Sequence, residues 1–272
     1  MKIYDRDYRE ITVEEKEQWE KVKKEEVWGK DLAGNILIKV NKWSEYPKAV
    51  RHWLSLFPNN FLDPMDLKNN PKRMSDVLHR YLSVLDEEAT NERTLLNFIK
   101  DHRAYYIVGA IFNSFTFGHH GAFVFPEFQI GNSFKIDFLL VGESSGGYQF
   151  IFVEFEHPHK NIFKKEGHLG DAFRKGLNQI QDWREWVQEY FPSFSETFEK
   201  VKGKNQSLPR EFLKLDSSRF HYVVVAGRRS DFQLNIDKTY RIQREYLERK
   251  IHLLHYDNLY DMTKEVIRKG NY

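Results

Sequence analysis

The chain has 272 residues, 40% of them hydrophobic and 15% aromatic, so it can build a substantial core and is not a disordered chain. It contains no cysteine, which excludes disulfides, thiolate zinc sites and a cysteine nucleophile. The formal charge is only +2, so a nucleic-acid partner would have to be bound by a local basic patch.

Targeting and membrane segments are not expected. Residues 1–26 are charged throughout and lack the apolar stretch of a signal peptide. No window reaches about 18 uninterrupted apolar residues, the length that a membrane-spanning helix needs. We therefore expect a cytoplasmic protein without a membrane partner.

The first third of the chain is predicted to be mostly helical. Mixed Glu and Lys with few apolar positions indicate a solvated helix over 13–28, and residues 35–40 indicate a short strand. Further helices are predicted at 44–57 and 74–88, the second with apolar residues at helical spacing. The intervening residues 59–73 are rich in Asn, Pro and Asp, which predicts a loop.

From about residue 89 the pattern favours a mixed sheet. A long apolar helix is predicted at 91–112, and three strands follow at 122–130, 134–141 and 148–156. Short Gly-containing connectors between these strands indicate two hairpins. Hairpins followed by alternating strands and helices predict an α/β (α+β) domain whose mixed sheet is flanked by helices. The later predicted elements are a helix at 170–190, an irregular segment at 191–218, a buried strand at 221–228, a helix at 238–249, a buried strand at 251–256 and a helix at 257–268.

The strand at 148–156 is apolar but ends in two acids, Glu154 and Glu156. Because residues i and i+2 of a strand face the same side, these acids share one face, about 6.5–7 Å apart. The hairpin makes Asp137 a cross-strand neighbour of Glu154 on that face. Opposed like charges destabilise a sheet, and a divalent cation that prefers oxygen ligands would offset the repulsion.

A metal ion held in this way is suited to phosphodiester hydrolysis, because it orients a water and stabilises charge on the phosphate. An alternative for the same residues is an ordinary exposed strand face, with Asp137 in a salt bridge to Lys135 on its own strand. Glu156 can likewise be either a catalytic acid or a solvated residue at the end of its strand.

The stretch IDFLLVGESSGGYQFIFVEFEHP (136–158) resembles the hairpin of the PD-(D/E)XK nuclease superfamily, in which an Asp on one strand precedes Glu-x-Lys on the next. More narrowly, the chain resembles the Shedu antiphage-defence family over roughly 90–265. The resemblance implies a nuclease-like domain at 90–272 and an accessory or regulatory region at 1–89. The stretches that carry it are NERTLLNFIKDH (91–102), LNQIQDWREWV (177–187), HYVVVAGRRSDF (221–232) and IHLLHYDNLYDM (251–262).

The resemblance also implies roles for individual residues. Asp137 and Glu154 match the metal ligands, with Mg²⁺ as the expected ion and Mn²⁺ as an alternative. Gln179 matches a glutamine of the family's helix and would support the site, although it could also be a packing or capping residue. Glu92 matches an acid that is sometimes present in the opening helix.

Glu156 is the main departure from the family pattern, because it stands where the motif usually has lysine. Some restriction nucleases of the superfamily also carry Glu at this position and are active. An amine could instead come from Lys135 on the face of Asp137, or from Lys160 just after the strand.

Basic residues after the hairpin are candidates for contact with DNA phosphates. The cluster within 160–175 is the best candidate, and an ordinary solvated surface is the alternative. Five histidines lie loosely around the hairpin without the spacing that a zinc site needs. These histidines are His119, His120, His157, His159 and His168.

We therefore predict a Mg²⁺-dependent DNA endonuclease without an organic cofactor. A role in bacterial antiphage defence and assembly as a homo-oligomer are implied by the resemblance alone. A catalytically silent nucleic-acid-binding module that kept the fold but lost the motif lysine is the main alternative. A glycoside hydrolase with paired carboxylates is a weaker one, since the short hairpin makes no obvious sugar cleft.

Overall fold

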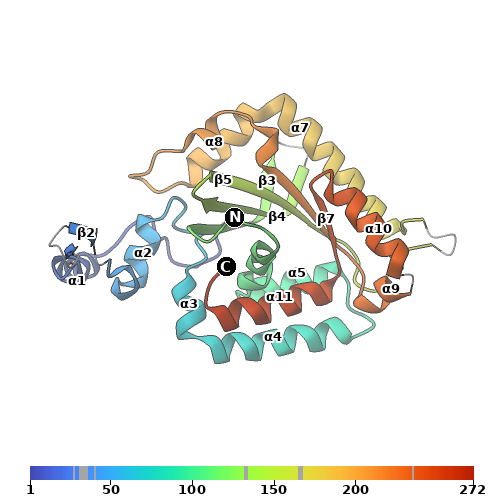
Figure 1. Cartoon of the computed structure of the whole chain (residues 1–272), viewed down its shortest axis with the longest axis horizontal. Helices are drawn as coiled ribbons and strands as arrows, with labels where there is room; N and C mark the ends of the chain where they lie inside the picture. The colour runs from blue at the N-terminus through green and yellow to red at the C-terminus, as the bar shows by residue number, and fades with distance from the viewer. Residues whose placement is uncertain (27, 31–35, 40, 132–133, 165–167, 235) are drawn as a thin grey trace.

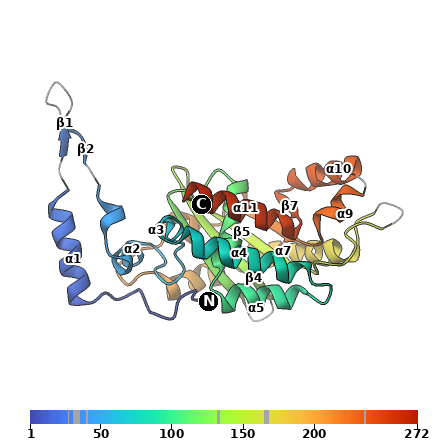
Figure 2. The same ribbon diagram turned by 90° about the horizontal axis from the view of Figure 1, so that it is seen from below.

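A five-stranded sheet lies at the centre of the computed structural model, between helices on both faces (Figure 1). The N-terminal residues form an arm that extends from one side of this body (Figure 2). The structure describes residues 1–26, 28–30, 36–39, 41–131, 134–164, 168–234 and 236–272.

The central sheet has the strand order β3-β4-β5-β6-β7 and is mixed, as the sequence predicts. β3, β4 and β5 are consecutive antiparallel neighbours, so both predicted hairpins are confirmed. β5, β6 and β7 are parallel to one another, which makes β5 the junction between the two halves. The strands are β3 (Gly121–Ile130), β4 (Phe134–Ser144), β5 (Gly147–Phe155), β6 (Phe220–Val225) and β7 (Ile251–Leu254).

Each face of the sheet contributes to its own hydrophobic core. Phe150 and Phe152 of β5 pack with α7, whereas Ile151 and Val153 join the core on the opposite face. The first core is covered by α7 (Asp171–Val201), α8 (Arg210–Leu213), α9 (Arg229–Gln233) and α10 (Ile236–Leu247). The second is covered by α3 (Pro64–Asn69), α4 (Pro71–Asp86), α5 (Glu92–Asp101), α6 (Tyr105–Gly109) and α11 (Tyr256–Lys269). This three-layer arrangement confirms the predicted α/β class.

The N-terminal arm consists of α1 (Val13–Lys24), the antiparallel strands β1 (Trp28–Lys30) and β2 (Ile36–Lys39), and the following η1 (Trp43–Glu45) and α2 (Lys48–Leu54). α1 has no buried residue, as expected for a solvated helix. It is shorter than predicted, because it ends at Lys24 and Trp28 begins a strand. The predicted strand at 35–40 is present as β2, although residues 35 and 40 lie outside the described part of the chain.

The predicted loop at 59–73 is wrong, because it contains α3 and the start of α4. Asp63 caps α3 by accepting a hydrogen bond from the backbone N–H of Met65 at 2.9 Å. Pro64 and Pro71 occupy the first positions of the two helices, where proline is favoured. Here Asn, Pro and Asp begin helices rather than interrupt them.

The single long helix predicted at 91–112 is also wrong. α5 ends at Asp101, and α6 and a 3₁₀ segment, η2 (Ala110–Ser114), follow it. Arg103 separates the two helices with a φ of 51°, in the left-handed region that a non-glycine residue seldom adopts. The apolar run continues because residues 104–112 are all buried.

The segment at 191–218, predicted to be irregular, begins with the second half of α7. The helix bends at Tyr190 and continues past Pro192 to Val201. Pro192 lies in the first turn after the bend, where proline is tolerated, and Phe191, Phe194 and Phe198 are buried on this continuation.

The end of α7 is attached to the N-terminal region by hydrogen bonds. The N–H of Gly203 donates to the carbonyl oxygen of Leu56 at 2.9 Å, and the Gln206 side chain donates to that of Leu54 at 3.0 Å. α4 packs against α11 in the layer beneath the sheet. The predicted division into 1–89 and 90–272 stays a prediction.

Among the described residues, no helix combines the length and the apolar character that crossing a membrane requires.

Candidate active site

Asp137, Glu154 and Glu156 lie together where β5 ends, on the side of the sheet that α7 covers. The register of β4 and β5 places Asp137 beside Glu154. Asp137 Oδ2 accepts a hydrogen bond from the backbone N–H of Phe155 at 2.9 Å, which fixes this carboxylate against the neighbouring strand. The structure therefore brings together the three acids that the strand pattern singled out.

These carboxylates are buried and repel one another. Glu154 is 4% exposed and Glu156 is 3% exposed. Burial raises the pKa of Glu154 well above its ordinary value, and the negative charges of Asp137 and Glu156 raise it further. Burial raises the pKa of Asp137 as well, although the hydrogen bond from Phe155 acts in the opposite direction. A site of this kind favours ionised carboxylates only when a positive charge is close.

Part of that positive charge comes from α7. Lys175 Nζ lies 2.9 Å from Oε1 of Glu156 and donates a hydrogen bond to Oε2 at 3.1 Å. Burial raises the pKa of Glu156, and the hydrogen bond and charge of Lys175 oppose that rise. The sequence places Lys175 among DNA-contacting residues, but the structure directs it into the acid cluster. Lys175 and Gln179 are four residues apart, and this spacing predicts that both lie on one face of the helix.

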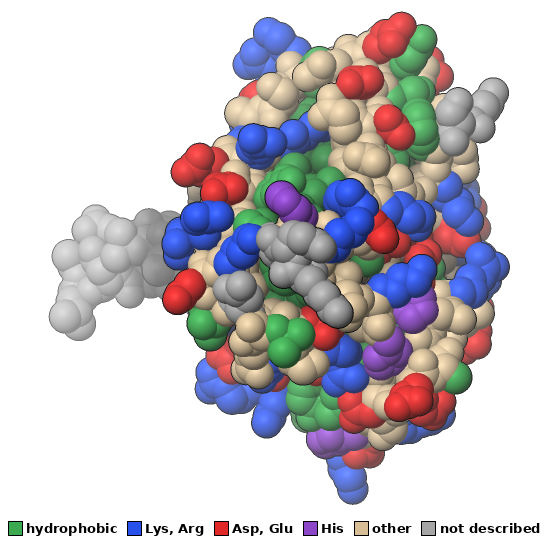
Figure 3. Space-filling model, turned by 90° about the vertical axis from the view of Figure 1, so that its right-hand side faces the viewer, with side chains coloured by type: hydrophobic (Ala, Val, Ile, Leu, Met, Phe, Trp, Pro, Cys, Tyr) green, Lys and Arg blue, Asp and Glu red, His purple; other side chains and the backbone are tan. Residues whose placement is uncertain are grey.

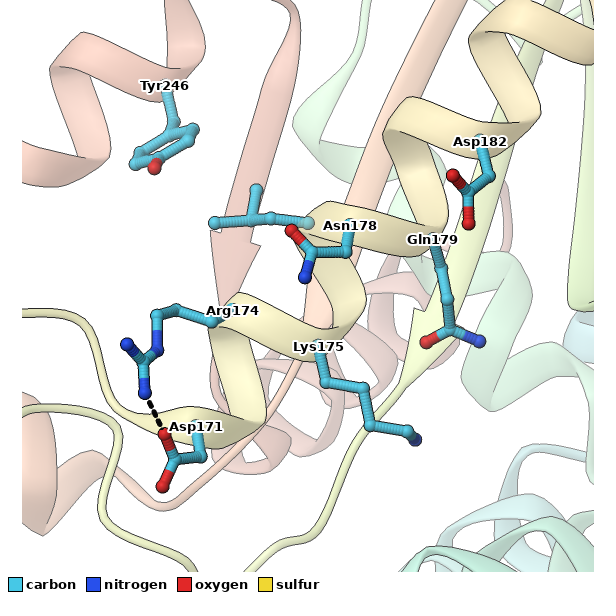
Figure 4. Close-up of a pocket in the computed structure, with 8 residues that line it drawn as sticks. Asp171, Arg174, Lys175, Asn178, Gln179, Asp182 and Tyr246 are labelled. Carbon is cyan, nitrogen blue, oxygen red and sulfur yellow. Dashed lines mark hydrogen bonds and ion pairs between the residues drawn. The ribbon is translucent and has the colours of Figure 1, made fainter.

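Gln179 extends from the same side of α7 as Lys175, as Figure 4 shows. Its side-chain amide lowers the pKa of Glu154 and so partly offsets the rise caused by burial. Its Oε1 is buried and has no hydrogen-bond partner among the described residues. Gln179 therefore lies at the predicted site, with an oxygen still available to a ligand.

Two contacts fix the position of Glu156, one with α11 and one with α7. The Tyr256 hydroxyl donates a hydrogen bond to the backbone carbonyl oxygen of Glu156 at 2.7 Å. Gly176 lets α7 approach the sheet closely, because a Cβ at this position would lie 2.7 Å from Val224 Cγ1 and 3.5 Å from Glu156 Cγ. The close approach at Gly176 brings the neighbouring Lys175 within reach of Glu156.

A fourth acid, Glu92, approaches from the other helical layer. It is the first residue of α5, after the Asn91 cap. Its negative charge contributes to the raised pKa of Asp137, Glu154 and Glu156. The acid that the family resemblance matched in the opening helix thus lies within electrostatic range of the other three.

The residues fit a hard divalent cation through the chemistry of their oxygen atoms. Glu154 Oε2 is buried without a hydrogen-bond partner among the described residues, as is Gln179 Oε1. No group of three or more His, Asp or Glu side chains in the described ranges has the geometry of a complete metal cage. Mg²⁺ seldom uses such a cage and is commonly held by one or two carboxylates together with water and substrate phosphate. Two neighbouring carboxylates are therefore sufficient for it.

The two other lysines considered for the site lie differently. Lys135 forms an ion pair with Glu127 at 2.7 Å, and both side chains are about half exposed. Lys160 also lowers the pKa of Glu156, but less than Lys175 does. Of the histidines, His159 lies with Nε2 3.0 Å from the carbonyl oxygen of Glu87.

A groove of about 730 Å³ runs along α7 next to the acid cluster. Lys175 and Gln179 belong to its lining, and so does Tyr246 of α10, which lies on the other side of α7 from them (Figure 4). One end of the molecule carries α9, α10 and the start of α7. Lys and Arg side chains gather near the middle of this surface (Figure 3). Arg228 contributes little to that surface, because Asp86 and Asp257 hold its guanidinium.

A mixed sheet between two helical layers, with buried acids at the end of its central strand, defines an α/β protein consistent with a nuclease-like fold. The family model for the C-terminal part of the Shedu protein SduA matches residues 89–260, well over half of the chain. The chain therefore belongs to the Shedu family, and this membership indicates a role in antiphage defence. A search of curated proteins found no match.

Proposed function

We propose that this chain is a metal-dependent DNA endonuclease that acts in defence against phage. The observation that carries the proposal is the group of buried acids at the end of β5, where Glu154 Oε2 has no hydrogen-bond partner among the described residues. Burying carboxylates without compensation is costly, and a hard divalent cation would supply the compensation. Family membership adds independent support.

Asp137 and Glu154 would hold the ion, either Mg²⁺ or Mn²⁺. When bound, such an ion favours the hydroxide form of water and stabilises negative charge on a phosphate. The hydrogen bond from Phe155 keeps Asp137 oriented, and the amide of Gln179 does the same for Glu154. Glu156 would orient the attacking water or a second ion.

A DNA substrate fits the surroundings of the site better than an uncharged one. The groove beside α7 is lined by Arg174 and Lys175, and it opens onto the end of the molecule where basic side chains gather (Figure 3). Contacts of Lys and Arg with phosphates supply most sequence-independent affinity for DNA. Arg174 also pairs with Asp171, so a phosphate would have to displace or join that pair.

One observation favours a second candidate, a silent nucleic-acid-binding module. Glu156 replaces the lysine of the usual motif. Its ion pair with Lys175 supplies part of the positive charge that a metal ion would otherwise bring to the acid cluster. Such a module would bind DNA with the same surface but would have no reaction to catalyse. Cleavage with a divalent metal distinguishes the two candidates.

The test is incubation of the purified chain with supercoiled and linear DNA in Mg²⁺, Mn²⁺ or EDTA. We expect nicking or cutting with a metal and none in EDTA. Asp137→Asn and Glu154→Gln, which remove a negative charge while keeping the side-chain size, should each abolish cleavage. Glu245→Gln is the matched control, because this exposed acid only pairs with Arg241 on α10.

DNA binding without cleavage in any divalent metal would contradict the nuclease and support the silent module. Equal cleavage by the unaltered chain and by Asp137→Asn would place the reaction elsewhere or in a contaminant. The defence role is tested by challenging cells that carry the chain with phages, beside cells that carry Asp137→Asn. The predicted self-association is tested by native mass spectrometry of the purified chain.

A further inference from the structure

The motif lysine of the nuclease hairpin is missing from its usual position. Glu156 stands there, immediately after β5, and is 3% exposed. Lys135 on β4 forms an ion pair with Glu127, and Glu156 forms its ion pair with Lys175 rather than with Lys160. Neither of these lysines replaces the missing amine at the acid cluster.

An amine does reach the cluster from α7. Lys175 Nζ lies 2.9 Å from Glu156 Oε1, and the ammonium favours the charged forms of Asp137 and Glu156. The Lys175 side chain is 59% exposed, whereas that of Glu156 is 5% exposed, so the pair joins the groove to the buried site. Lys175 and Gln179 extend from the same side of the helix (Figure 4).

The backbone around this pair is fixed on both sides. Tyr256 holds the carbonyl oxygen of Glu156, and the N–H of Glu156 donates to the carbonyl oxygen of Val225 at 2.8 Å. Gly176 lets α7 pack against Val224 and Glu156. The side chain at position 156 and the side chain at position 175 are therefore set to meet. If the two residues were swapped, the amine and the carboxylate would still meet at this site.

We propose that Lys175 is the catalytic lysine of this chain, supplied by α7 and held in place by Glu156. The inference rests on the proposed nuclease function. During hydrolysis the water oxygen forms a bond to phosphorus while the bond to the leaving sugar oxygen breaks. One water proton passes to solvent, and the leaving oxygen takes a proton from solvent. The ammonium keeps its protons and donates hydrogen bonds to the attacking water and to a phosphate oxygen.

The test compares Lys175→Met with the exchanged pair Glu156→Lys/Lys175→Glu, which returns the lysine to the strand. Lys135→Met is the control, because it removes a lysine whose partner is Glu127. We expect Lys175→Met to lower the cleavage rate by roughly 100-fold to 1,000-fold, the range for removing one fixed hydrogen-bond donor that stabilises developing negative charge. The exchanged pair should recover at least roughly tenfold of this loss. Lys135→Met should cleave like the unaltered chain.

Two further readouts separate catalysis from structure. The rise in melting temperature caused by Mn²⁺ should be retained in Lys175→Met. DNA affinity in Ca²⁺ should fall far less than the cleavage rate, because Arg174 also lines the groove. Loss of the Mn²⁺ effect, without recovery in the exchanged pair, would make Lys175 a structural residue and overturn the inference. Unchanged cleavage by Lys175→Met, with Asp137→Asn inactive, would overturn the inference but leave the nuclease intact. If the unaltered chain cuts DNA with no metal at all, both proposals fail.

Discussion

Two buried acids of this molecule are treated in opposite ways. Asp63, the N-cap of α3, has a fully buried side chain. It accepts hydrogen bonds from Arg51 Nε and from the backbone N–H of Met65, each at 2.9 Å. Glu154, at the end of β5, is almost as buried, but its Oε2 has no hydrogen-bond partner among the described residues. The same chain therefore satisfies one buried carboxylate and leaves another exposed to repulsion.

The difference teaches how to separate a structural acid from a functional one. Burial alone does not distinguish Asp63 from Glu154, and neither does residue type. What differs is the source of compensation, which for Asp63 is an arginine within the fold. For Glu154 the nearest charges are other carboxylates, so the compensation has to come largely from outside the fold.

The largest expected effect comes from breaking the satisfied pair. Arg51→Met would leave the carboxylate of Asp63 buried without its cation, and losing one partner of a buried pair costs roughly 3–5 kcal/mol. We expect a loss of that size in the free energy of unfolding, measured with urea. Arg241→Met is the control, because its pair with Glu245 is exposed and should contribute at most ~0.5 kcal/mol. A loss below ~1 kcal/mol in Arg51→Met would remove the contrast between the two acids.

Replacing Glu154, the acid without a hydrogen-bond partner on Oε2 among the described residues, is expected to raise the stability rather than lower it. The folded-state pKa of Glu154 is raised, so stability falls as the pH rises from the ordinary pKa of a glutamate toward the folded value. Glu154→Gln removes this loss. In EDTA at pH 8 it should gain roughly 2 kcal/mol, which is ~4–8 °C in melting temperature for a domain of similar size.

At pH 4 the gain in Glu154→Gln should nearly vanish, because the glutamate of the unfolded chain is then also mostly protonated. Melting curves of the unaltered chain and the variant at the two pH values measure this difference. Destabilisation at pH 8 would mean that Glu154 is satisfied in a way that the structure does not contain.

The smallest expected effect is stabilisation by the metal itself. Mg²⁺ at several times its dissociation constant should raise the stability of the unaltered chain by ~1 kcal/mol. The rise in melting temperature should be larger at pH 8 than at pH 6, because Asp137 and Glu154 must lose protons to bind the ion. Asp137→Asn should abolish it. A Mg²⁺ effect that persists in this variant would point to a different metal site.

The hairpins and the location of the acids could be predicted from the sequence because both follow local rules. Alternation along β5 fixes which side Glu154 and Glu156 face, and a short turn fixes which strand pairs with it. Several helix boundaries follow no such local rule. Asn, Pro and Asp serve equally as loop residues and as the caps and first residues of α3 and α4. Pro192 is tolerated within α7 because the kink at Tyr190 places it in the first turn of the second helical segment.

The pairing of Lys175 with Glu156 lies beyond such reasoning for a different reason. It depends on how closely α7 approaches the end of β5, and Gly176 sets that approach through a contact with Val224 on a strand that comes later in the chain. The spacing of Lys175 and Gln179 shows only that they share a face. Which face points to the acids depends on the packing of the whole helix against the sheet.

α7 also connects two distant parts of the molecule. It consists of two helical segments that meet at a kink at Tyr190, and the first segment carries Lys175 near its start. The second segment leads to Gly203, which is hydrogen-bonded to Leu56 in the N-terminal region. The acid cluster and the N-terminal region are therefore joined through one continuous element that packs on the aromatic core.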